Sequence, residues 1–156
     1  MLQIKIYCFI GLSLFLAHCG NDSPIKPSSS LLPKIIIVDS DSAISTHRDP
    51  VELRQSSLKR DTLTLLVSYS GGCEKHDFAL YGLSYFMKSN PVQSNIYLTH
   101  DAHGDLCEAY ITEKLLFDLT PLKEIYKERH GDYGPIIIHV FMPGSPISVQ
   151  TFRYDF

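Results

Sequence analysis

The chain has 156 residues, of which 44% are hydrophobic and 20% are charged, and its formal net charge at pH 7 is −3. This length is typical of a single domain that buries its own core, so folding requires neither a structural metal nor many disulfides. The mildly acidic balance lacks the basic surface of nucleic-acid-binding proteins, and we expect no nucleic-acid partner.

The N-terminal segment has the pattern of a secretory signal. Lys5 is its only cation, and residues 6–17 are uncharged and mostly apolar. A membrane-spanning helix needs about 20 apolar residues, and this run is shorter. We therefore expect residues 1–18 to be a signal peptide.

The signal ends in Leu16-Ala17-His18-Cys19, which resembles the lipobox of bacterial lipoproteins. The resemblance implies that Cys19 is lipidated, with acyl chains such as palmitate, and becomes the new N-terminus. It also implies a protein of the bacterial cell envelope, membrane-anchored by lipid, with its domain outside the cytoplasm. His18 departs from the small residue that usually precedes the cysteine. Ordinary secretion remains the alternative.

Residues 19–33 are predicted to be the lipidated cysteine followed by a flexible tether. The segment is rich in Pro, Ser and Asn and has little to bury. We expect a single β-sandwich domain over residues 34–156.

The domain sequence consists of short β-branched or alternating runs that turn residues separate. Gly71-Gly72 and Ser89-Asn90-Pro91 are examples of these turns. Strands are predicted at residues 35–38, 62–70, 78–87, 95–100, 108–118, 136–142 and 148–156. This spacing favours an immunoglobulin-like antiparallel β-sandwich of about seven or eight strands.

One short helix is predicted over residues 121–130. Thr120 can cap it, Pro121 suits its first position, and Gly131 suits the residue after its end. Leu122 and Tyr126 belong to an apolar stripe that would pack on a sheet.

Two cysteines remain once the signal is removed and Cys19 is lipidated. Outside the cytoplasm, pairing is the usual state of such thiols, so we predict a disulfide between Cys73 and Cys107.

Three histidines lie near these cysteines in the sequence. Cys73-x2-His76 and His100-x2-His103-x3-Cys107 contain the imidazole and thiolate ligands that Zn or Cu prefers. His76, His100 and His103 are therefore candidate metal ligands. The alternatives are a disulfide with no metal, and a redox-active pair, although the C-x-x-C spacing of redox motifs is absent.

Other combinations of polar residues are less specific. Asp39 and Asp41 alternate as in a calcium loop, but the glycine and distal Glu of an EF-hand are missing. Ser68, His139 and Asp101 could form a catalytic triad on paper, but no hydrolase motif accompanies them. We predict no catalytic residue.

The function favoured by these observations is that of a lipid-anchored envelope protein acting as a binding or structural module, for an unknown protein or small ligand. A histidine-based divalent metal-binding lipoprotein is the alternative. Residues 71–76 and 117–122 loosely resemble uncharacterised bacterial lipoprotein domains, which implies no activity. Four tyrosines expected on strands could form a binding face or simply pack in the sheet: Tyr81, Tyr85, Tyr97 and Tyr110.

Overall fold

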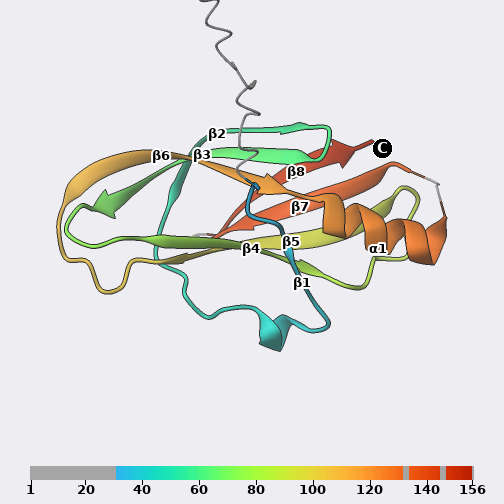
Figure 1. The fold of residues 1–156 in the computed structure, drawn as a ribbon, viewed down its shortest axis with the longest axis horizontal. Coiled ribbons are helices and arrows are strands. Elements are labelled where there is room, and N and C mark those ends of the chain that lie inside the picture. The colour runs from blue at the N-terminus through green and yellow to red at the C-terminus, as the bar shows by residue number, and fades with distance from the viewer. Residues whose placement is uncertain (1–30, 132–133, 145–146, 156) are drawn as a thin grey trace, which may run out of the picture. The chain divides into compact units, whose positions relative to one another are not determined.

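The computed structural model describes residues 31–131, 134–144 and 147–155 of the chain. The expected signal peptide, Cys19 and the tether as far as residue 30 lie outside the described residues. The described part is a sandwich of two β-sheets with one α-helix (Figure 1).

The smaller sheet has three antiparallel strands in the order β2-β3-β6. They are β2 (Glu52–Lys59), β3 (Thr62–Gly71) and β6 (Ala109–Asp118). β3 and β6 are paired along their whole length, from Thr62 opposite Asp118 to Gly71 opposite Ala109. β2 was not predicted, because it is an edge strand whose sequence is mostly polar and gives only a weak apolar alternation.

The larger sheet has five strands in the order β1-β4-β5-β7-β8. Their bounds are Ile36–Val38, Asp77–Leu83, Val92–Asp101, Ile136–Met142 and Ser148–Tyr154, respectively. The expected strand over residues 78–87 ends at Leu83, so Tyr85 follows the strand rather than lying on it.

The predicted mainly β sandwich with one short helix is confirmed. Two pairs, β1–β4 and β5–β7, are parallel, whereas we expected antiparallel pairing throughout. The parallel pairing of β5 and β7 follows from the path of the chain between them. After β5 the chain crosses to β6 in the other sheet and returns to β7 through the helix. Such a long crossover allows β7 to run in the same direction as β5.

The helix α1 (Thr120–His130) has the predicted position. Pro121 lies in its first turn, and Gly131 ends it with φ 76° while its N–H donates to the Lys127 carbonyl at 2.9 Å. The expectation that Thr120 caps the helix is wrong, because the cap position is Leu119, which makes no side-chain cap hydrogen bond. The Asp118 carboxylate accepts the Thr120 N–H at 2.9 Å. Leu122 and Tyr126 of the expected stripe are buried.

The core lies between the sheets and under α1. It is formed by alternate residues of the central strands, which place every second side chain on the inner face. Members with no exposed surface include Leu63, Leu65, Val67, Ile96, Leu119, Leu122, Ile136, Ile138 and Val140.

The segment before β1 connects the two sheets. The Asp118 N–H donates to the Pro33 carbonyl at 2.9 Å, and the Ile35 N–H donates to the Asp118 carbonyl at 3.0 Å. The next residues form β1 and pair with β4. The last residue of the expected tether, Pro33, is thus hydrogen-bonded to β6.

Candidate functional site

The structure contains the expected disulfide between Cys73 and Cys107, with Cα atoms 5.9 Å apart. It joins the turn after β3 to the segment before β6, just beyond the last paired residues, Gly71 and Ala109. Because the two sulfurs are bonded to each other, neither is available as a thiolate ligand.

Asp105 organises the backbone around the disulfide. Its Oδ2 accepts the N–H groups of Gly72, Cys73 and Glu74 at 2.8, 2.9 and 3.0 Å, and its Oδ1 accepts that of Cys107 at 2.8 Å. These N–H donors, that of Glu74 above all, hold the pKa of the Asp105 carboxyl well below its usual range. Asp105 is therefore a buried anion, its side chain 0% exposed.

The Asp105 carboxylate begins a chain of hydrogen bonds through two buried histidines. Asp105 Oδ2 lies 3.2 Å from His76 Nε2, and His76 Nδ1 lies 2.8 Å from His100 Nε2. His100 Nδ1 lies 3.0 Å from the carbonyl oxygen of Asp49. The structure thus brings two of the three candidate metal ligands together, beside the disulfide as expected.

The number of protons in this chain follows from its ends. The Asp105 carboxylate and the Asp49 carbonyl can only accept, so His76 Nε2 and His100 Nδ1 must both carry a proton. The contact between His76 Nδ1 and His100 Nε2 needs one further proton, because two unprotonated nitrogens cannot form a hydrogen bond. Burial lowers the pKa of His100, which favours its neutral form. The third proton lies between the two rings, and the positive charge that it adds to the pair balances the charge of Asp105.

We expect three of the four ring nitrogens of His76 and His100 to carry protons near neutral pH. Nitrogen-15 NMR of the imidazole rings measures this count, because protonated and bare nitrogens have well-separated chemical shifts. The exposed His130, which lies outside this chain of hydrogen bonds, serves as the reference ring. Two protons shared by the pair would contradict the assignment.

Aromatic rings enclose the histidine pair. Tyr69 stacks on His76 with ring centroids 4.6 Å apart, and Phe78 stacks on His100 at 4.4 Å. The Tyr69 hydroxyl donates to Glu113 Oε2 at 2.7 Å, and burial raises the pKa of Tyr69 to about 12. Within this enclosure the side chain of His76 is only 2% exposed.

The third candidate ligand, His103, lies on the opposite face of the sheet. Its Nε2 is 2.8 Å from Asp77 Oδ2, and its Nδ1 is 3.7 Å from Asp101 Oδ1. Successive side chains of a strand point to opposite faces, so Asp77 and Asp101 face away from the neighbouring His76 and His100.

The described part of the chain does not assemble the three-histidine set. Within it, the close group of metal-ligand types is Cys73, Asp105 and Cys107, and the disulfide occupies its sulfurs. We therefore treat His76 and His100 as hydrogen-bond partners and do not carry a metal into the proposed function.

The residues of the triad considered on paper lie apart in the structure. Ser68 Oγ bonds to Thr112 Oγ1 at 2.8 Å, while His139 Nε2 bonds to Gln93 Oε1 at 2.7 Å. Asp101 contacts His47 and His103 instead. These three residues offer no nucleophile–base pair.

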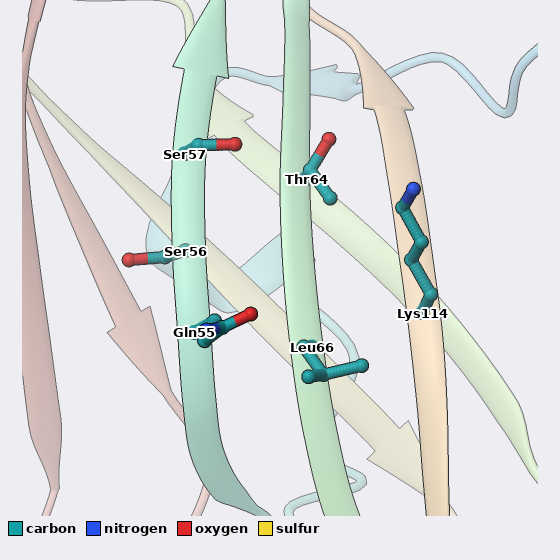
Figure 2. Close-up of a pocket in the computed structure, with 6 residues that line it drawn as sticks. All are labelled: Gln55, Ser56, Ser57, Thr64, Leu66 and Lys114. Atoms are coloured by element: carbon teal, nitrogen blue, oxygen red, sulfur yellow. The ribbon is translucent and has the colours of Figure 1, made fainter.

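A polar groove lies on the outer face of the three-stranded sheet. Gln55, Ser57, Thr64, Leu66 and Lys114 line it, with a volume of about 630 Å³. Ser56 also lines the groove, and Figure 2 shows the Ser57 hydroxyl directed toward β3 and the Ser56 hydroxyl directed to the other side of β2. The groove offers hydrogen bonds and one cation, but its only large apolar side chain is Leu66.

The outer face of the five-stranded sheet has a different chemistry. Tyr81 and Tyr97 lie opposite each other on β4 and β5, and Tyr97 stacks on Phe141 with centroids 4.9 Å apart. Tyr110 lies on the other sheet, where its hydroxyl donates to Glu52. The four tyrosines named from the sequence therefore do not form one platform.

Asp105 is a site residue that sequence reasoning missed. The available signal was a carboxylate close to a Gly-Gly turn and two cysteines, where free N–H groups need an acceptor.

Three solved structures with a similar fold come from Bacteroides species. One is a protein of unknown function from Bacteroides vulgatus, 14% identical, with TM-score 0.56, covering 80% of this chain and 57% of that one. A NigD-like immunity protein from Bacteroides caccae is 18% identical, with TM-score 0.55 and coverage of 80% and 63%. A candidate lipoprotein from Bacteroides fragilis is 10% identical, with TM-score 0.54 and coverage of 79% and 70%.

At these identities the likeness concerns the fold alone. The chain spans about three fifths of the length of the first of these proteins. No protein-family profile matches the chain, and no curated protein sequence matches it significantly. Within the described residues, no helix combines the length and apolar character that crossing a membrane requires.

Proposed function

We propose that this chain is a lipid-anchored protein of the bacterial cell envelope whose domain acts as a binding module outside the cytoplasm. The observation that carries the proposal is Leu16-Ala17-His18-Cys19 behind the uncharged run of residues 6–17. A cysteine in this position is the acceptor of lipid in bacterial lipoproteins.

Two further observations support the proposed location. The Cys73–Cys107 disulfide fits an oxidising compartment, where such bonds persist. The fold also occurs in a candidate lipoprotein from Bacteroides fragilis, so it is compatible with this form of anchoring.

The binding role is supported by what the domain presents. Its outer faces carry a polar groove and a set of outward aromatic side chains, whereas the polar residues examined as a triad lie apart. A sandwich with such faces provides surfaces on which a ligand can bind. Because sandwiches host many functions, the fold alone does not identify the ligand.

The anchor is tested by replacing the lipid acceptor. We expect the wild-type protein to sediment with membranes and to partition into detergent, and the Cys19→Ser variant to appear in the soluble fraction. The Cys8→Ser variant is the matched control and should behave as the wild type, because Cys8 lies within the signal. Membrane association of Cys19→Ser equal to that of the wild type would contradict the anchor.

A further inference from the structure

An apolar row crosses the outer face of the larger sheet. Ile36 pairs with Tyr81, Tyr81 with Tyr97, Tyr97 with Phe141, and Phe141 with Val149. Residues opposite each other on neighbouring strands point to the same face, so these five side chains form one line over all five strands. We call Ile36, Tyr81, Tyr97, Phe141 and Val149 the apolar row.

The row is partly open to solvent. Ile36 and Val149 at its ends are 44% and 43% exposed, and the three aromatic residues between them are of intermediate burial. A solvated sheet face is usually polar, so a continuous apolar line of this length is unusual on a face that meets solvent.

Arg48 lies beside the middle of the row. The segment around it is fixed against β5, because the Asp49 N–H donates to the His100 carbonyl at 3.1 Å. Arg48, Tyr97, Phe141 and Ile147 help to line a cavity of about 230 Å³. Ile147 is 66% exposed and adds to the apolar surface at its mouth.

The guanidinium of Arg48 is free to pair with a ligand. It makes no hydrogen bond or ion pair within the described ranges. Burial raises the pKa of Tyr97, and its hydrogen bond with the Asn95 side chain lowers it; among the nearby charges, Asp41 raises this pKa and Arg48 lowers it. Both charges therefore act at the Tyr97 hydroxyl, and the cation is the one that lines the cavity.

We propose that this cavity binds a carboxylate attached to an aromatic or branched apolar group. The carboxylate pairs with Arg48, whose planar fork suits a single carboxylate, and the apolar group packs between Ile147 and the Tyr97–Phe141 stack. Free aromatic acids and the C-terminal residue of a peptide share this chemistry. The inference names the ligand class of the proposed binding module, but it does not depend on the lipid anchor.

Calorimetric titration of the full-length protein in detergent tests the charge contact, with micelles alone as the blank. The probes are N-acetylphenylalanine and its uncharged amide, which differ only at the carboxylate. We expect the acid to bind at least about tenfold more tightly than the amide. A peptide that ends in free phenylalanine distinguishes the two ligand sources: tighter binding than the acid favours a peptide, and weaker binding favours a free acid.

Variants separate the two parts of the site. Arg48→Gln should abolish the preference for the acid, whereas Lys88→Gln, which removes an exposed cation elsewhere, should preserve it. Phe141→Ser should weaken the binding of both probes to a similar extent. Asp41→Asn should strengthen the binding of the acid, because it removes a nearby negative charge. Equal binding of acid and amide to the wild type, no binding at millimolar concentration, or an unchanged preference in Arg48→Gln would overturn the proposal. The anchor and the ligand class are tested separately. A Cys19→Ser protein that is fully soluble and still prefers the acid would support both, whereas one that stays with membranes and prefers the acid would contradict the anchor alone.

Discussion

The Cys107→Ser variant should lose about 2–4 kcal/mol of unfolding free energy relative to the oxidised wild type. The disulfide closes a loop with a sequence separation of 34, and removing it gives the unfolded chain more conformations. The bond also lies next to the N–H groups of Cys73 and Cys107 that Asp105 accepts. Its loss would loosen the end of the sandwich that holds the histidine pair.

Urea unfolding of oxidised wild type, reduced wild type and Cys107→Ser measures this contribution. The reduced wild type should resemble the variant, because both lack the cross-link. The Asp155→Asn variant is the control for an exposed position and should change stability by less than about 0.5 kcal/mol. A loss below about 1 kcal/mol in both reduced wild type and Cys107→Ser would show that the bond does not constrain the fold.

Asp105→Asn should lower the melting temperature by roughly 10 °C or more. An asparagine oxygen can still accept the N–H groups of Gly72, Cys73 and Glu74, but its amide nitrogen would then face the N–H of Cys107. The substitution also removes the anion beside the two buried histidines, so the extra proton that this pair shares loses its counter-charge. Thermal unfolding monitored by circular dichroism measures the loss.

The pH dependence of the same pair of proteins gives a second test. The pKa of Asp105 is depressed in the folded state, so its contribution to stability is complete above the unfolded value of about 3.9 and is lost as pH falls further. The difference between wild type and Asp105→Asn should therefore narrow below about pH 4. A constant difference down to pH 2 would show that the charge of Asp105 is not what stabilises the fold.

The sequence predicts the helix and the strands whose residue patterns are strong. It does not predict the features that depend on which strands pair in the folded structure. The helix is correct because Pro121 and Gly131 mark its ends, and the central strands have apolar residues at every second position. β2 escapes detection because it is polar and gains its structure from pairing with β3. The parallel pairs could not be predicted, because they depend on which strands become neighbours in space.

The candidate sites were also predictable from the sequence only in part. Proximity of His76 and His100 to the disulfide follows from the sequence, since both lie close to a cysteine in the chain. The orientation of His103 could not be predicted from the sequence, because it depends on the turn between Asp101 and Asp105. Tyr81 and Tyr97 could be placed on strands, but their alignment with Phe141 requires the register of three strands.

The lipid anchor is the central claim of this account, and mass spectrometry of the N-terminal peptide from purified membranes tests it most directly. We expect a peptide that begins at Cys19 and carries the additional mass of the lipid, and no peptide that contains residues 1–18. An unmodified Cys19 still joined to His18 would contradict it.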